Sequence, residues 1–282
     1  MKLNTFYDIY YSHRVKKAKI ITKVYIIITL PINYLINKVL YPKKINLDIY
    51  EKKNPKLYKK NLKSLLKHFN SDKGEYFKNQ YQKPINLEDK YLKGHRYHSF
   101  YDKFLINKKM SKINLLELGS FKGNATAAFF FYFKNGIFFS GDLYPDLFCY
   151  KSERIKNFLI DTSSEKELKK KIIQNKEKYD VIIEDAGHYL KDQIISLFML
   201  FRKLNKNGIF VIEELDFPNT RKDMNLNNEK PSLKDILSLV KKNKDFSSKY
   251  ISKKDKKYFL SNYKSINIYK GRFNEIAFIK KK

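Results

Sequence analysis

The chain lacks tryptophan altogether and has one cysteine, nine glycines and seven prolines among 282 residues. Because Cys149 is the only cysteine, the chain cannot form an internal disulfide framework or a zinc site made of several thiolates. It also lacks a long hydrophobic run. The apolar stretch 20–42 is broken by Lys23 and Pro31, and its uninterrupted part, 24–30, falls short of the about 20 residues that cross a bilayer.

Acidic residues are scarce beside basic ones, with 29 Asp and Glu against 59 Lys and Arg and a net charge of +30. Such a charge is typical of proteins that bind nucleic acid, an anionic membrane or an acidic substrate. The lysines are spread along the whole chain, which is also rich in Asn, Ile, Tyr and Phe. A coding bias toward AT-rich codons therefore explains the charge as well as a function does.

Residues 1–70 are predicted to form a basic and apolar helical extension. A basic stretch at 13–19 precedes the apolar one, and no small-residue cleavage site of a signal peptide follows. Three interpretations stay open: an anchor lying on a membrane surface with lysines at the headgroups, a helix packed on the domain or on a second subunit of a homo-oligomer, and a membrane span. We expect a cytoplasmic protein, with peripheral attachment to the membrane in the first case.

From residue 113 onward, short apolar strands alternate with helices. The predicted strands are 113–119, 136–142, 157–161, 179–185 and 209–215, and the predicted helices are 123–134, 163–178 and 192–208. This alternation predicts a parallel sheet covered on both faces. A hairpin at 265–281, turning at Lys270-Gly271, adds an antiparallel edge. The expected fold class is α/β, with a Rossmann-like, mostly parallel sheet, an antiparallel C-terminal hairpin strand and the N-terminal helical extension.

Acids and glycines follow one another at the ends of the first three strands. LLELGSFKGNAT places Gly119 after a strand and Gly123 at the start of a helix, so backbone N–H groups can approach a ligand there. Glu117 is unexpected inside a strand end unless it meets a cation. The dinucleotide pattern G-x-G-x-x-G and the P-loop are both absent, so NAD is not expected. Asp142 can take both hydroxyls of a ribose, and Asp161 can approach an adenine amino group.

This order of motifs resembles the class I S-adenosylmethionine (SAM)-dependent methyltransferases over residues 113–282. In that family the glycine turn lies against the methionine part of the cofactor, and the acids after strands two and three bind ribose and adenine. Phe121 departs from the pattern, because many members have a second glycine there. The resemblance implies a set of SAM-binding residues: Glu117, Gly119, Ser120, Gly123, Asp142, Asp161 and Thr162.

The fourth and fifth strands end in EDAGH and VIEEL. Because both ends reach the same edge of a parallel sheet, Asp185, Glu213 and Glu214 can converge there. Three carboxylates without a thiolate suit a hard cation, Mg²⁺ above all. His188 lies three residues after Asp185 and can act as a general base, whereas Glu184 points to the other side of the strand.

This second group of residues is similar to the metal-dependent sugar O-methyltransferases of macrolide biosynthesis and their cephalosporin-hydroxylase-like relatives. The resemblance implies Asp185, Glu213 and Glu214 as Mg²⁺ ligands and His188 as the base. In that family a T-D-K-G…H-x-Y…Y segment covers the active site, and SDKG at 71–74 and HRYHSFY at 95–101 match it within 71–112. The residues implied on the substrate side are Asp72, Lys73, His95, Tyr97 and Tyr101. Glu214 departs from the family, which usually has Asp there.

We therefore expect a SAM-dependent O-methyltransferase that acts on a hydroxyl of a sugar or glycosylated metabolite, with Mg²⁺ and a histidine base. The expected partners are a small-molecule or glycan acceptor and an anionic membrane surface. Two alternatives stay open. The net charge favours an RNA methyltransferase, although strand four lacks the proline-aromatic motif of base amino-methylation. A non-catalytic, membrane-associated scaffold that keeps the fold is the other.

Overall fold

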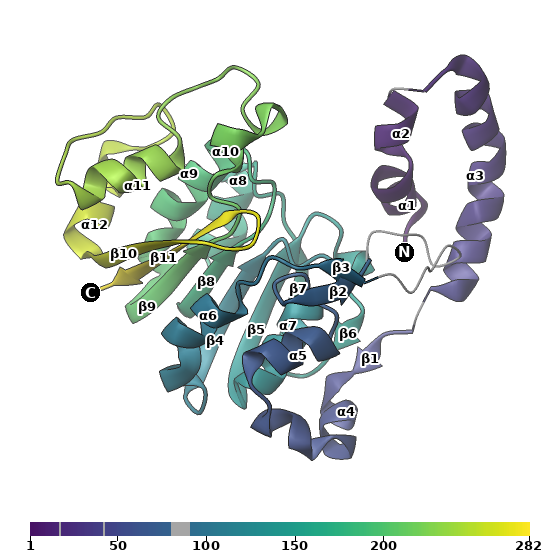
Figure 1. The fold of residues 1–282 in the computed structure, drawn as a ribbon, viewed down its shortest axis with the longest axis horizontal. Helices are drawn as coiled ribbons and strands as arrows, with labels where there is room; N and C mark the ends of the chain where they lie inside the picture. Colours follow the sequence, from purple (N-terminus) through teal and green to yellow (C-terminus); the bar gives the residue numbers. More distant parts are fainter. Residues whose placement is uncertain (17, 42, 80–90) are drawn as a thin grey trace.

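A seven-stranded sheet forms the centre of the computed structural model, which describes residues 1–16, 18–41, 43–79 and 91–282 (Figure 1). Its strands, in spatial order, are β10 (Tyr263–Lys270), β11 (Glu275–Lys281), β9 (Leu204–Ile212), β8 (Tyr179–Glu184), β4 (Lys112–Leu118), β5 (Asn135–Asp142) and β7 (Ile155–Leu159). Pairing is parallel from β9 through β7, and β11 is antiparallel to both β9 and β10. The predicted fold class is confirmed.

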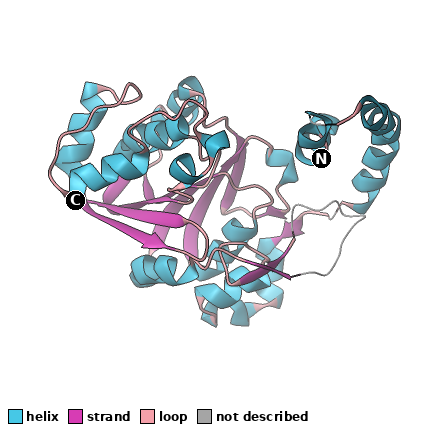
Figure 2. Cartoon of the chain, turned by 45° about the horizontal axis from the view of Figure 1, so that its top comes forward, coloured by secondary structure: helices cyan, strands magenta, loops and turns pink. Residues whose placement is uncertain are grey.

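The central strands are continuous apolar runs, as expected where helices bury both faces of a sheet. Successive residues of β4 enter different cores: Leu115 packs in one and Leu116 in the other, and both are fully buried. Figure 2 shows helices on both sides of the strands. The first core takes residues from α5 (Leu62–His68), α6 (His98–Leu105) and α7 (Asn124–Tyr132), and the second from α9 (Leu190–Leu200), α11 (Leu233–Lys241) and α12 (Lys253–Asn262).

Several predicted boundaries are wrong for identifiable reasons. The helix predicted at 192–208 ends at Leu200, and β9 begins at Leu204, because Leu204 pairs with Tyr179 before the register shifts to Val181 and Ile209. The helix predicted at 163–178 is capped by Ser164, whose side chain accepts the N–H of Glu167. It is short, however: α8 spans Glu165–Leu168 and continues as a π-helical segment, Lys169–Ile173.

The third strand and the covering segment also differ in detail. β7 ends at Leu159, so Asp161 lies two residues beyond the strand rather than at its end. The covering segment predicted at 71–112 contains a two-stranded ribbon of β2 (Tyr76–Lys78) and β3 (Tyr91–Lys93), and residues 80–90 lie outside the described part of the chain. The closing hairpin is confirmed, with Gly271 in its turn.

After the first three helices of the extension, β1 (Ile45–Asn46) pairs in parallel with β6 (Tyr150–Lys151). The chain continues from β1 into α4 (Leu47–Lys53) and a 3₁₀ helix, Pro55–Lys59. Asn46 caps α4 by accepting the N–H groups of Asp48 and Ile49. The part of the predicted extension from 43 to 70 is thus largely helical, but in three short pieces, α4, the 3₁₀ helix and α5.

The first helices form a hairpin that stands beside the sheet (Figure 1). It consists of α1 (Leu3–Tyr10), α2 (Ser12–Lys16) and α3 (Ile20–Leu40). Within the described residues, α3 is long and apolar enough to cross a membrane when judged by length and composition alone. The expectation that this stretch falls short was wrong, because the helix continues through Pro31 and reaches 21 residues.

Candidate active site

A cavity of about 710 Å³ lies at the carboxyl ends of the parallel strands, where residues from β4, β5, β8 and β9 meet. Most predicted site residues line it: Asp72, Lys73, His95, Glu117, Gly119, Ser120, Asp142, Asp161, Thr162, Asp185, His188, Glu213 and Glu214. Three predicted residues are not among its lining residues. Gly123 begins α7, and Tyr97 and Tyr101 stand behind the two glutamates.

The glycine turn after β4 needs its glycines for steric reasons. Gly119 has φ +88°, and a Cβ there would stand 1.9 Å from the carbonyl oxygen of Asp185. Gly123 has φ +79°, and its Cβ would meet the Phe148 ring at 2.4 Å. Phe121 also takes a left-handed φ of 45°, so the turn keeps its conformation without the family's second glycine. The close approach of Gly119 to Asp185 brings the first and fourth strand ends into contact.

Asp142 ties two of the cavity-forming loops together. Its Oδ2 accepts the N–H of Phe121 at 2.7 Å, and its Oδ1 accepts that of Tyr144 at 2.8 Å. Burial raises the pKa of the carboxyl, and the two N–H donors oppose this shift. Each oxygen keeps a further lone pair for a ligand hydroxyl. Asp161 accepts the N–H of Ser163 at 2.9 Å and its hydroxyl at 2.7 Å, which fixes the third strand's loop at the cavity wall.

A buried ammonium stands among three carboxylates on the other side of the cavity. Lys73, 2% exposed, contacts Asp185 and lies 2.9 Å from Glu213 Oε1 and 4.0 Å from Glu117 Oε1. Burial alone would lower the pKa of Lys73, but Asp185 and Glu213 raise it well above its usual value. Burial raises the pKa of Glu117 to about 7 and that of Glu213 to about 8, against the attraction of Lys73. The cation expected near Glu117 is therefore the Lys73 ammonium.

The fourth and fifth strand ends bring a second trio together. His188 Nε2 lies 3.7 Å from Asp185 Oδ1 and 3.8 Å from Glu214 Oε2, and the three ligand atoms lie within 4.8 Å of one another. Among the described residues, neither Glu214 Oε2 nor His188 Nδ1 has a hydrogen-bond partner, although both atoms are buried. Glu213, the third ligand predicted from the sequence, is instead held by Lys73 and by the Tyr101 hydroxyl. The structure thus joins two predicted ligands with the predicted base.

Two members of this trio have a left-handed backbone conformation. His188 has φ 56° and Glu214 has φ 48°, values that are unusual for residues with side chains. Such strain persists where the surrounding structure enforces it, and it is commonly found at functional sites. Burial raises the pKa of Glu214 well above its usual range, and the nearby charges of Asp185 and Glu213 add to this. Burial lowers the pKa of His188, although Asp185 opposes the shift.

The segment 95–101 supports the two glutamates from the other side. The Tyr97 hydroxyl donates to Glu214 Oε1 at 3.3 Å, and His95 Nδ1 lies 3.3 Å from the same oxygen. The Tyr101 hydroxyl donates to Glu213 Oε1. Tyr97 and Tyr101 are fully buried, and they act as positioning residues for the acids.

Sequence reasoning missed several lining residues. Lys122 adjoins the predicted Gly123 and Tyr144 lies two residues after the predicted Asp142, so extending each motif by two positions would have found them. Asp192 and Arg221 come from segments predicted as ordinary helix and loop, and neither carried a motif. Other residues missed in the lining are Ser71, Asn124, Leu143, Tyr189 and Phe217.

Among the comparisons with known proteins, only the solved structures gave matches. No family model matches the chain, and no curated protein matches it. Two crystal structures of the MycE methyltransferase from the mycinamycin biosynthetic pathway are similar in fold, one in complex with Mg and SAH and one with Mg, SAH and mycinamycin VI. Both show a TM-score of 0.59 at 16% identity over 79% of this chain. The chain covers 55% and 54% of those chains, about half their length.

This likeness confirms the predicted fold, a Rossmann-like, mostly parallel sheet with an antiparallel C-terminal edge. At 16% identity it does not extend to a substrate or a metal.

The buried Lys73 ammonium should be essential to stability. Lys73→Met keeps most of the stem but leaves Asp185 and Glu213 without their cation, so we expect the free energy of unfolding to fall by about 3–5 kcal/mol at pH 8 in urea denaturation. Lys203→Met is the matched control, because Lys203 is also buried but bonds only carbonyl and amide oxygens. Its loss should be about 1–3 kcal/mol. Equal losses in the two variants would contradict the role of charge pairing.

Buried acids should make the metal-free protein less stable as the pH rises. The pKa of Glu214 is raised well above 4.5 and that of Glu184 to about 8, both mainly by burial. Each acid therefore favours folding fully below pH 4.5 and loses that contribution as the pH rises through its raised pKa. Glu214→Gln and Glu184→Gln should each raise the free energy of unfolding by roughly 1–3 kcal/mol at pH 9 in EDTA. Urea curves whose differences from the parent do not shrink toward pH 4.5 would refute this.

Proposed function

We propose that the chain is a SAM-dependent O-methyltransferase that acts on a hydroxyl of a sugar or glycosylated metabolite with the help of Mg²⁺. The observation that carries the proposal is the trio of Asp185, His188 and Glu214 in the same cavity as the glycine turn of Gly119. The likeness to MycE, a methyltransferase crystallised with Mg, SAH and mycinamycin VI, supports it.

The cofactor side of the proposal uses the first three strand ends. Backbone groups of the turn from Gly119 to Gly123 would hold the methionine part of SAM, with Glu117 and Ser120 beside it. Asp142 would accept the ribose hydroxyls, and its two N–H bonds fix the carboxylate in advance. Asp161 and Thr162 would face the adenine. These residues lie along one wall of a cavity whose volume is typical of cofactor sites.

The donor set fits a hard divalent cation. Lys73 balances part of the charge of Asp185 and Glu213, and Glu214 Oε2 lies buried with no hydrogen-bond donor among the described residues. A bound divalent cation would stabilise the ionised forms of Glu213 and Glu214, whose pKa values are raised by burial in its absence. Mg²⁺ prefers carboxylate oxygens, so Asp185 and Glu214 would hold it and Glu213 could take part through its second oxygen. When bound, the metal would lower the pKa of the acceptor hydroxyl, and SAM would supply the methyl group.

The protein's own residues perform the remaining tasks. His188 would take the hydroxyl proton at Nε2, the ring nitrogen that faces Asp185 and Glu214. Its lowered pKa keeps the ring neutral and able to accept a proton near pH 7. Lys73, Tyr97 and Tyr101 hold the carboxylates in position, and His95 and Asp72 would face the acceptor. Catalysis would come mainly from aligning the acceptor oxygen with the methyl group.

An RNA acceptor is the alternative that the net charge of +30 favours. Incubation with methyl-labelled SAM and either total RNA or a panel of glycosylated metabolites separates the two. Label in RNA would refute the sugar proposal. A folded protein that binds no SAM would instead be the non-catalytic scaffold.

Asp142 should be a main determinant of cofactor affinity. Asp142→Asn keeps the shape of the side chain but loses the charge and one of two acceptors, so we expect SAH affinity to fall about 10- to 100-fold in calorimetry. Asp180→Asn is the matched control, because Asp180 also accepts two hydrogen bonds on a strand but is not among the cavity's lining residues. An Asp142 variant with unchanged SAH affinity would refute the ribose assignment.

Metal dependence should follow the trio. EDTA and Asp185→Asn should each lower methyl transfer at least about 100-fold, because the acceptor loses its activating cation. Added Mg²⁺ should raise the melting temperature of the parent and of Glu184→Gln, but not that of Asp185→Asn. Glu184 is a fair control since it is buried next to Asp185 in the chain and is not among the cavity's lining residues. Unchanged turnover in EDTA would show that the metal assignment is wrong while leaving methyl transfer intact.

A further inference from the structure

The outer surface of α3 is apolar and exposed along its whole length. Eleven large apolar side chains of this helix are exposed, including Ile21 (84%), Ile28 (66%) and Ile32 (60%). At 100° per residue, these eleven cover an arc of about 220°. A helix that packs on one protein core needs a stripe of about 100°. The exposed arc is therefore wider than the face that one packing partner would cover. Such a wide apolar surface is expected of a helix immersed in lipid.

The opposite side of α3 is already occupied. Ile26 is buried against Phe6 and Tyr10 of α1, and Tyr34 packs in the same small core. The Tyr34 hydroxyl also donates to the carbonyl of Met1 at 3.1 Å. These contacts fix which side of α3 faces outward, so the exposed arc is a defined surface of the folded hairpin.

Charge around the hairpin favours anionic lipid. No Asp or Glu occurs from residue 9 to residue 47, whereas eight Lys and Arg residues do. Lys16 ends α2, Lys19 and Lys23 lie at the beginning of α3, and Lys38 lies in its last turn, with Lys43 three residues after its end. Basic residues at both ends of an apolar helix match the layout of interfacial anchors, whose lysines contact lipid phosphates.

We propose that the extension lies in the plane of an anionic membrane, with the exposed arc of α3 immersed and the flanking lysines at the headgroups. An in-plane position keeps α1 on the side of the rest of the protein, where Lys2 N–H and the Thr5 hydroxyl donate to Asp146 at 2.6 and 3.0 Å. A spanning position would draw these contacts and Asp8, which accepts from the Tyr144 hydroxyl, toward hydrocarbon.

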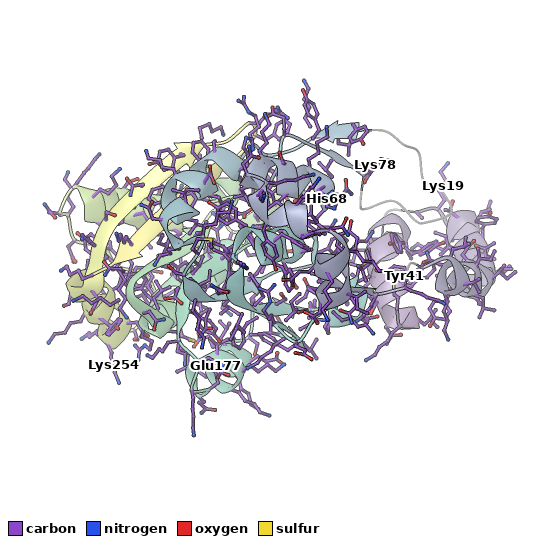
Figure 3. All side chains as sticks on the ribbon, turned by 90° about the horizontal axis from the view of Figure 1, so that it is seen from below. Lys19, Tyr41, His68, Lys78, Glu177 and Lys254 are labelled. Carbon is purple, nitrogen blue, oxygen red and sulfur yellow. The ribbon has the colours of Figure 1, made fainter. Side chains whose placement is uncertain are left out.

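The anchor would hold the cavity near the membrane. The extension contacts the loop after β5 at Tyr144, Asp146 and Leu147, the last through the Tyr41 hydroxyl at 2.9 Å. Figure 3 labels Tyr41, which lies where the extension meets the rest of the chain, and Lys19 on the extension itself. The same loop lines the cavity with Asp142, Leu143 and Tyr144. An acceptor carried in the membrane would therefore meet a cavity wall that is tied to the anchor.

The test is flotation of the full chain with vesicles of phosphatidylcholine alone or with 30% phosphatidylglycerol (about one lipid in three). We expect flotation with the anionic vesicles and a loss of at least about tenfold in affinity on Ile21→Glu, Ile28→Glu and Ile32→Glu combined. The matched control combines Ile106→Glu, Met110→Glu and Leu226→Glu, which change the charge equally at exposed apolar sites elsewhere. SAH binding should be equal in all three proteins, which shows that each is folded whatever the vesicle result.

Three results would overturn the proposal. In the first, the protein does not float with the vesicles, is a dimer in light scattering, and becomes a monomer with the α3 substitutions. The exposed arc would then be a subunit interface. Another is equal loss of flotation in the control, which would make binding a matter of net charge. The third is resistance to extraction at alkaline pH together with protease protection of the α2–α3 turn, which would make α3 a membrane span. A protein that floats as expected but binds no SAH would refute the methyltransferase proposal alone.

Discussion

The arrangement of the site depends on one buried charge, the Lys73 ammonium among Glu117, Asp185 and Glu213. Carboxylates from three different strands could not share a desolvated volume without a cation, because each would repel the others in a medium of low dielectric constant. Lys73 reaches this position from outside the sheet, on a loop whose backbone is paired with residues 94–97. The covering segment and the sheet are thus joined by ion pairs as well as by packing. Without the lysine, no cation would offset the repulsion between these carboxylates.

Lys73 pairs with Asp185 and Glu213, whereas burial and the nearby acids raise the pKa of Glu214 well above its usual range. Glu214 keeps an oxygen without a hydrogen-bond donor in the described part of the chain, and both Glu214 and His188 are held in left-handed backbone conformations. A protein that had only to be stable would have avoided the first cost with an apolar side chain and the second with glycine. Retaining them is consistent with a site that is complete only when a further cation is bound.

The sequence alone predicts the strand ends well, because parallel strands bring their carboxyl ends to one edge whatever their spacing in the chain. Gly119, Asp142, Asp185 and Glu214 were placed correctly for this reason. It does not predict that Lys73 would contact Asp185 and Glu213, since that depends on a loop path fixed by long-range hydrogen bonds. Periodicity also failed where pairing decided the outcome, as at Leu204, which joins β9 although its segment reads as helix. Pro31 does not end α3, because one proline removes a single backbone donor and the helix continues past it. The sequence therefore underestimates the length of this helix.

Charge is distributed unevenly between the surface and the site, and this bears on the acceptor. The chain has 59 basic residues against 29 acidic ones, and lysines occur at both ends of the molecule, as Lys19 on the extension and Lys254 at the remote end show (Figure 3). The cavity floor, in contrast, holds more acids than bases where the trio lies. A phosphate beside the reacting hydroxyl would approach Asp185, Glu213 and Glu214, and Coulomb repulsion would oppose it unless the metal lay between them. A neutral hydroxyl compound meets no such barrier. Under the proposed function, the acids in the cavity would thus favour an uncharged acceptor at the point of reaction, and under the membrane proposal the basic surface would attract anionic lipid.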